Sequence, residues 1–196
     1  DEILITQSEH ASNVLPWFKV AELTKATIKY IPLTKEGRLT IENFKKTITK
    51  HTKVVSLALI TNVLGFNVDI KEISKIAHEY GAVVVCDGAQ SVPHMKTDVK
   101  DLDCDFLSFS AHKMCGPTGV GVLYGKYELL EKMQPQNVGG GMNNDFESDK
   151  TYRYKEIPYR LEAGTPNIAG VIGLGAAIDY ISKIGIENIE TYVKSL

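Results

Sequence analysis

Short apolar runs alternate along this chain with stretches in which apolar residues recur at helical spacing. The runs are rich in β-branched residues, and polar or glycine-containing segments bound them, as is typical of strands. The run at 54–60 is almost continuously apolar, which indicates a strand covered on both faces. We expect strands at 3–6, 27–33, 54–60, 82–86, 106–109 and 120–124.

Helical spacing and capping residues predict the intervening helices. Asp69, with Glu72 three residues on, is typical of a helix start, and Gly81 stands where such a helix would end. Thr165 and Pro166 predict the start of a long helix, with Thr165 as its N-cap. We expect helices at 15–23, 40–49, 69–80, 128–133 and 167–184, and a final one from about 186.

The alternation of strands and helices predicts an α/β layered domain with a mainly parallel sheet. Ligands of such sheets collect at the carboxyl ends of the strands. Four polar residues follow predicted strands at that end, namely His10, Asn62, Asp87 and Ser110. Residues 134–160 break the alternation, and we expect there a long excursion that contains a hairpin.

Length and composition limit the function classes. The 196 residues suffice for one substantial core, and the net charge of -2 disfavours nucleic acid or an anionic membrane surface as a partner. No apolar run approaches the roughly 18 residues of a membrane span. The three cysteines, Cys86, Cys104 and Cys115, form no CxxC pair, so we interpret them as reduced core thiols of a cytoplasmic protein.

Lys113 and Asp87 are the residues with the clearest chemical potential. A lysine amine can form a Schiff base with an aldehyde, and Lys113 directly follows a buried strand. Asp87 ends the neighbouring strand, where a carboxylate can pair with a pyridine nitrogen. Each has a plainer alternative, a surface lysine and a helix-capping aspartate. Together they favour a site for pyridoxal phosphate (PLP).

Several further residues suit the same cofactor. His10 has the pKa range for proton transfer and a ring that can stack on a flat heterocycle. Gln90 can reach a phenolic oxygen, and Ser110 with His112 can donate to a phosphate. The other histidines show no metal-ligand spacing with the cysteines, so we predict no metal. The glycines from Gly119 to Gly125 do not follow dinucleotide-binding spacing.

Five motifs in the same order give the chain a specific family resemblance. It resembles the large domain of class V PLP-dependent aminotransferase-fold enzymes (fold type I), and within them the SufS-like, group II cysteine desulfurases. The match runs over essentially the whole chain. The motifs are Glu-His-Ala-Ser-Asn at 9–13, Thr-Asn-Val-Leu-Gly at 61–65, Asp-Gly-Ala-Gln at 87–90, Ser-Ala-His-Lys at 110–113 and Glu-Ala-Gly-Thr-Pro-Asn at 162–167.

The resemblance implies a role for each matching position. Lys113 matches the lysine that holds PLP covalently, and His10 matches the histidine stacked on its ring. The remaining matches are Asp87 to the partner of the ring nitrogen, Gln90 to the contact of the phenolic oxygen, Ser110 and His112 to phosphate ligands, Asn62 to an asparagine on the substrate or cofactor side, and Thr165 to a threonine that reaches the cofactor of the second subunit. The last match implies a homodimer with shared sites.

Departures from the family pattern concern both motifs and extent. Ala11 and Ser12 replace the usual His-Ala pair, and Ala111 replaces a glycine. The nucleophilic cysteine of the family belongs to a small C-terminal domain that nothing in this chain matches. We therefore expect residues 1–196 to be a partial PLP-binding large domain without the N-terminal segment and the small domain.

The implied activity is conversion of L-cysteine to L-alanine, with the sulfur passed as a persulfide to an acceptor or scaffold protein of iron–sulfur cluster assembly. A selenocysteine lyase or another class V PLP lyase or transaminase is an alternative. For the chain alone, a non-catalytic dimerisation or partner-binding module is a further alternative.

Overall fold

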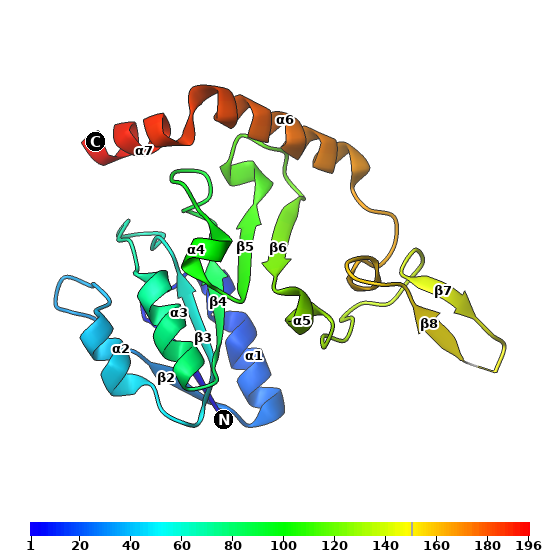
Figure 1. Cartoon of the computed structure of the whole chain (residues 1–196), viewed down its shortest axis with the longest axis horizontal. Helices are drawn as coiled ribbons and strands as arrows, with labels where there is room; N and C mark the ends of the chain where they lie inside the picture. The colour runs from blue at the N-terminus through cyan, green and yellow to red at the C-terminus, as the bar shows by residue number, and fades with distance from the viewer. Residues whose placement is uncertain (150) are drawn as a thin grey trace.

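A six-stranded sheet forms the centre of the molecule in the computed structural model, which describes residues 1–149 and 151–196 (Figure 1). The strand order is β2-β1-β3-β4-β5-β6. The first five strands are parallel, and β6 runs antiparallel to β5. The strands are β1 (Glu2–Ile5), β2 (Thr27–Tyr30), β3 (Thr52–Ala58), β4 (Val83–Asp87), β5 (Phe106–Ser110) and β6 (Gly121–Gly125). The predicted mainly parallel sheet is confirmed.

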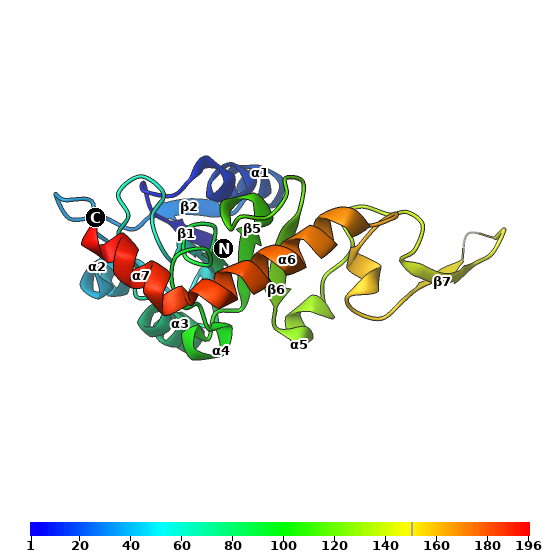
Figure 2. The same cartoon turned by 90° about the horizontal axis from the view of Figure 1, so that it is seen from above.

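Helices cover both faces of the sheet and its carboxyl edge. Helix α1 (Leu15–Thr24) lies on one face, whereas α2 (Ile41–Thr47), α3 (Ile70–Glu79) and α4 (Val99–Leu102) lie on the other (Figure 2). Figure 1 shows α6 (Ile168–Ile184) and α7 (Ile186–Ser195) passing across the carboxyl ends of the parallel strands. The fold is therefore a three-layer α/β arrangement, as the sequence predicts.

Local signals in the sequence explain where α2 and α3 begin and end. The Thr40 hydroxyl accepts a hydrogen bond from the backbone N–H of Asn43, and the Asp69 carboxylate accepts one from the N–H of Glu72. Gly81 follows α3 with φ of +72°, a conformation that costs glycine little. The core beneath these helices includes Leu4, Phe44, Val55, Leu57, Ile70, Ile73 and Val84, all fully buried.

Helix α6 begins later than its predicted cap. Its N-cap is Asn167, whose Oδ1 accepts a hydrogen bond from the backbone N–H of Gly170 at 3.0 Å. The prediction of Thr165 as the cap is wrong. A capping side chain accepts from the backbone N–H of the residue three positions on, and at the first turn of α6 Asn167 makes this bond. Gly170 is required there, since an added Cβ would lie 2.5 Å from Cγ2 of Val120.

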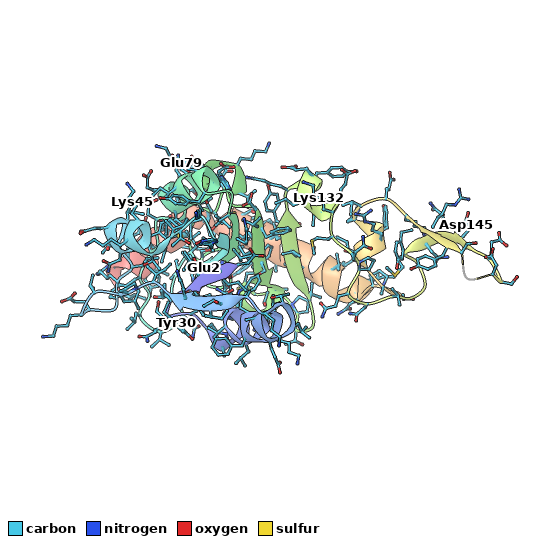
Figure 3. All side chains as sticks on the ribbon, turned by 90° about the horizontal axis from the view of Figure 1, so that it is seen from below. Glu2, Tyr30, Lys45, Glu79, Lys132 and Asp145 are labelled. Atoms are coloured by element: carbon cyan, nitrogen blue, oxygen red, sulfur yellow. The ribbon has the colours of Figure 1, made fainter. Side chains whose placement is uncertain are left out.

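The predicted excursion contains a two-stranded hairpin, β7 (Asn143–Phe146) and β8 (Tyr152–Tyr154), followed by the 3-10 turn Tyr159–Leu161. Short helix α5 (Tyr127–Leu130) precedes it. The hairpin projects from the body of the molecule, and Figure 3 shows Asp145 far from the strand that carries Glu2. The prediction of a hairpin is confirmed.

Two helices expose apolar side chains that pattern analysis would place in a core. On α1, Leu15 is 61% exposed and Leu23 is 71% exposed; on α6, Ile172 is 69% exposed. Within the described ranges, no single helix has the length and apolar character to cross a membrane; α6 and α7 meet that test only as a pair bent by 70°.

Candidate active site

The carboxyl ends of β4 and β5 bring the two central candidates together. Asp87 is the last residue of β4, and Ser110 is the last residue of the adjacent β5. A 3-10 turn, Ala111–Lys113, follows β5 directly and carries Lys113. The turn is closed by a hydrogen bond from the N–H of Gly116 to the carbonyl of Ala111. The strand ends thus place a carboxylate and an amine at one edge of the sheet.

A cavity of about 410 Å³ opens at this edge. Its lining contains His10, Ser12, Asn13, Asp87, Ala89, Ser108, Phe109, Ser110, His112 and Lys113. The structure therefore gathers His10, Asp87, Ser110, His112 and Lys113 around one space, although they come from three separate segments. Sequence reasoning assigned no role to the lining residues Ser12, Asn13 and Ser108, although Ser12 and Asn13 belong to the motif at 9–13.

Asp87 keeps hydrogen-bonding capacity for a ligand. Its Oδ1 accepts a hydrogen bond from the backbone N–H of Ala89 at 2.9 Å. Within residues 1–149 and 151–196, no side chain bonds its Oδ2, and Lys113 makes no ion pair. The plainer alternative of Asp87 as a local cap is thus true of one oxygen, whereas the second oxygen remains available.

Asn62 and Gln90 lie beside this cavity rather than in it. They line a neighbouring cavity of about 510 Å³ formed by the loops after β3 and β4 and by α7. The amide Nε2 of Gln90 donates to Oδ1 of Asn62 at 2.7 Å. Thr165 lines neither cavity and is exposed in the segment before α6.

His10 is carried by the loop between β1 and the 3-10 turn Ala11–Asn13. Its side chain is exposed at the cavity, and its Nδ1 accepts a hydrogen bond from the backbone N–H of Ser12 at 3.2 Å. Its carbonyl accepts a second bond, from the N–H of Asn13, at 2.7 Å. The imidazole is therefore oriented by its own loop.

Glu9 is a further residue of the site to which sequence reasoning assigned no role. Its carboxylate accepts hydrogen bonds from the side chains of Thr6 and Asn13 and from the backbone of Ala58. Burial raises the pKa of the Glu9 carboxyl, and the bonds from Thr6 and Asn13 oppose that rise. The sequence signal that could have pointed to Glu9 is an acidic residue four positions after the end of the buried strand β1.

The three cysteines differ in their environments. Cys86 and Cys104 are fully buried, and burial raises the pKa of Cys86 well above its ordinary value and that of Cys104 to about 11. Both are therefore core thiols, as expected. Cys115 is exposed, which corrects the interpretation of all three as core residues. Among the residues that the structure describes, no three His, Cys, Asp or Glu side chains are grouped as metal ligands.

The profile of the aminotransferase class-V family matches residues 1–196. The chain belongs to this family. Its members and the structural neighbours below are PLP-dependent enzymes, and the fold type I prediction agrees with their architecture.

Curated relatives of this class V chain are named as desulfurases. A probable cysteine desulfurase of Halalkalibacterium halodurans is 53% identical over all 196 residues, which cover 48% of that protein. One of Staphylococcus epidermidis is 51% identical, again over the whole chain and 47% of the relative. The chain thus spans about half the length of the curated relatives it matches.

Solved structures give the same comparison. The cysteine desulfurase CsdA of Escherichia coli superposes with a TM-score of 0.95 at 41% identity, covering 100% of this chain and 49% of that one. The cysteine desulfurase of Thermococcus onnurineus gives 0.93 at 43% identity, covering 97% and 48%. The cystine C–S lyase C-DES, in complex with cysteine persulfide, gives 0.86 at 25% identity over 97% and 52%.

Proposed function

We propose that the protein containing this chain is a PLP-dependent cysteine desulfurase, which converts L-cysteine to L-alanine and passes the sulfur on as a persulfide. One observation carries the proposal: Asp87 and Lys113 lie at the ends of adjacent parallel strands and line one cavity with His10. The names of relatives that are about 50% identical over the whole chain support the choice of substrate.

The residues present suit PLP. The cavity offers an amine for an aldehyde, a carboxylate oxygen for a ring nitrogen, and hydroxyl and imidazole donors for a phosphate. When bound there, PLP would supply an electron sink for carbanion chemistry at an amino acid. Asp87 would hold the ring nitrogen in its protonated form through Oδ2, the oxygen that Ala89 does not bond.

Lys113 and His10 are the proposed catalytic residues. Lys113 would attach the cofactor and, once displaced by substrate, exchange a proton at its Nζ. His10 would lie against the ring and move a second proton. Ser110 and His112 would bind the phosphate, because both line the cavity directly beside Lys113.

Residues outside the cavity receive different roles in the proposal. Gln90 and Asn62, which bond each other beside the cavity, would border the phenolic oxygen and the substrate. Thr165 would reach the phosphate in a second copy of the chain, because its exposure leaves it free to do so. The proposed assembly is therefore a homodimer with shared sites.

The sulfur-accepting cysteine is proposed to lie outside residues 1–196. Cys86 and Cys104 are buried with raised pKa values, so neither offers a thiolate to a substrate. Cys115 is exposed, but its position does not match the nucleophilic cysteine of the family. We further propose that residues 1–196 form part of the large PLP-binding domain, and that a sulfur-acceptor or scaffold protein of iron–sulfur assembly takes the product in the cytoplasm.

A second candidate function is a different class V lyase. The likeness to a cystine C–S lyase at a TM-score of 0.86 favours it, because that protein also releases sulfur from an amino acid. Selenocysteine lyase or transaminase activity would use the same cofactor residues. The chain alone would act only as a dimerisation or partner-binding module, because none of its three cysteines matches the nucleophilic cysteine of the family.

Release of alanine and sulfide from L-cysteine by the intact protein tests the proposal. We expect equimolar alanine and, with a thiol reductant present, sulfide. Pyruvate and ammonia in place of alanine would establish the lyase instead. Selenocysteine and cystine serve as parallel substrates, and residues 1–196 alone should be inactive. Turnover by residues 1–196 alone would overturn the placement of the thiol.

A further inference from the structure

We propose that Glu9 is a positioning residue that fastens the loop carrying His10 to the edge of the sheet next to Asp87. This inference rests on the proposed function, because it concerns the residue assigned to move a proton at the cofactor. The inference concerns geometry: the length of the half-buried Glu9 side chain sets where the imidazole lies.

Three hydrogen bonds join the Glu9 carboxylate to its surroundings. Oε1 accepts from the Thr6 hydroxyl at 2.7 Å, and Oε2 accepts from Nδ2 of Asn13 at 3.0 Å and from the N–H of Ala58 at 2.8 Å. Thr6 directly follows β1, Asn13 ends the His10 loop, and Ala58 ends β3. One carboxylate therefore connects both ends of the loop to the sheet.

The bond from the Ala58 N–H to Glu9 takes the place of a backbone hydrogen bond to β1, which does not pair with β3 at this point. Strand β1 pairs with β3 only as far as Leu4 and Val55, so the end of β3 extends beyond its neighbour. Glu9 supplies the acceptor that β1 does not provide. On the other side of β3, Ala58 is paired in register with Asp87. The loop of His10 is thus fixed to the residue beside the proposed cofactor carboxylate.

A second link makes this attachment specific. Oδ1 of Asn13 accepts a hydrogen bond from the buried hydroxyl of Ser56 at 2.6 Å, while its Nδ2 donates to Glu9. Asn13 is 8% exposed and Ser56 is fully buried, so water competes little for these bonds. A loss of the Glu9 bonds would therefore leave buried polar groups unpaired and release the loop.

Two conservative substitutions separate reach from charge. Glu9→Gln keeps the length: its carbonyl can accept from Asn13 and Ala58, and its NH₂ can donate to Thr6, whose hydroxyl then donates to Ser8. Glu9→Asp keeps the charge and shortens the side chain by one methylene. Glu2→Asp is the matched control, because Glu2 joins Thr49 and Thr52 to β1 at the opposite end of the sheet.

Hydrogen–deuterium exchange of the cofactor-free intact protein is the first readout. In Glu9→Asp, we expect the peptide over residues 7–14 to exchange roughly tenfold faster than in the wild type. In Glu9→Gln and Glu2→Asp, the same peptide should stay within about threefold. Unchanged exchange in Glu9→Asp would overturn the proposal.

Kinetics and visible circular dichroism of the PLP-loaded protein are the second readout. Glu9→Asp should lower kcat about tenfold with little change in KM, and should shift the cofactor dichroism in the direction that His10→Ala does. Glu9→Gln should restore both. An equal loss of kcat in the two variants would overturn the proposal, because the negative charge of Glu9 rather than the length of its side chain would then determine activity.

The two readouts distinguish the failure of this inference from the failure of the proposed function. A wild-type protein without a visible PLP band would overturn the proposed function. The exchange comparison would still decide whether Glu9 fastens the loop. Faster exchange in Glu9→Asp with unaltered kcat and dichroism would instead refute the positioning role, leaving Glu9 a purely structural contact.

Discussion

The two ends of the parallel sheet differ in how far their charged side chains are paired with one another. At the amino end, Asp105 pairs with Lys126 at 2.9 Å and with His78 at 2.9 Å, and it also accepts the N–H of Val84 at 2.7 Å. At the carboxyl end, within the part of the chain that the structure describes, the carboxylate of Asp87 accepts one hydrogen bond, from the N–H of Ala89, and Lys113 makes no ion pair.

The amino end is a closed network. Lys126 also bonds Asp103, whose pKa is lowered by that hydrogen bond. Glu2, labelled in the view of this end in Figure 3, pairs with Lys29 at 2.5 Å. Charges that satisfy one another hold neighbouring strands together, whereas charges left with free capacity are available to a ligand. The contrast teaches that charged groups at one end of the sheet are used to join neighbouring strands, whereas those at the other end keep capacity for the ligand that we propose.

The largest test of this contrast is Lys113→Ala. The intact protein should lose its visible PLP absorbance and at least about a thousandfold in turnover, roughly 4 kcal/mol of activation free energy. Its free energy of unfolding in cofactor-free form should change by no more than about 0.5 kcal/mol. Lys75→Ala, which removes an exposed lysine of α3, is the control. A retained visible band in Lys113→Ala would refute the attachment.

The matching substitution at the amino end is Asp105→Ala. It leaves Lys126 and His78 without their buried partner, so the free energy of unfolding should fall by about 3 kcal/mol in urea denaturation. Asp101→Ala, which removes an exposed pair with Lys71, should cost far less, because solvent screens that pair. PLP absorbance per folded molecule should stay the same. Equal costs for the two variants would contradict the division of roles.

Asp87→Asn tests the charge at the carboxyl end with little change of shape. Asparagine keeps an acceptor for the N–H of Ala89 but cannot hold a protonated ring nitrogen. We expect kcat/KM for L-cysteine to fall roughly a hundredfold, about 2.7 kcal/mol, with unfolding midpoints little altered. Full activity of this variant would show that the carboxylate is a local cap and nothing more.

Acid titration should separate the two ends with the smallest effect. Hydrogen bonding by Lys29 and Lys126 lowers the pKa values of Glu2 and Asp103 from their ordinary values of 4.5 and 3.8. The stability that these two groups contribute is therefore fully present at a pH above those ordinary values and is lost as the pH falls through the folded-state pKa values. The raised pKa of Glu9 has the opposite effect. The stability that Glu9 contributes is fully present below pH 4.5, its ordinary pKa, and is lost as the pH rises through its folded-state pKa.

Urea denaturation between about pH 7 and about pH 3 measures this difference. Relative to the wild type, Glu2→Gln should lose less stability on acidification, and Glu9→Gln should lose more. Each difference should be about 1 kcal/mol or less, because these groups are partly solvated. If the free energy of unfolding depended on pH in the same way for the wild type and both variants, the proposed electrostatic difference between the two ends would be wrong.

Sequence reasoning predicted the parts of this picture that local patterns encode. The apolar runs that end at Asp87 and Ser110 located the edge of the sheet, and Thr40 and Asp69 marked helix starts. Family motifs pointed to Lys113 and His10, whose roles stay predictions.

What the sequence did not reveal depends on contacts between distant segments. The amino-end network exists because β6 runs antiparallel, which brings Lys126 beside Asp105. The Glu9 carboxylate reaches Ala58, which is 49 residues away along the chain. Asn167 rather than Thr165 caps α6, because the chain enters the helix after Pro166. With a capping residue on each side of Pro166, the sequence alone leaves this choice undecided.

The bond from the Ser12 N–H to Nδ1 of His10 has a consequence for protonation chemistry. A nitrogen that accepts a hydrogen bond carries no proton, so the neutral imidazole is the Nε2–H tautomer. Nε2 of the neutral ring then carries the proton and can donate a hydrogen bond, and taking a second proton on Nδ1 would break the bond to Ser12. A single backbone amide thereby selects the tautomer of His10.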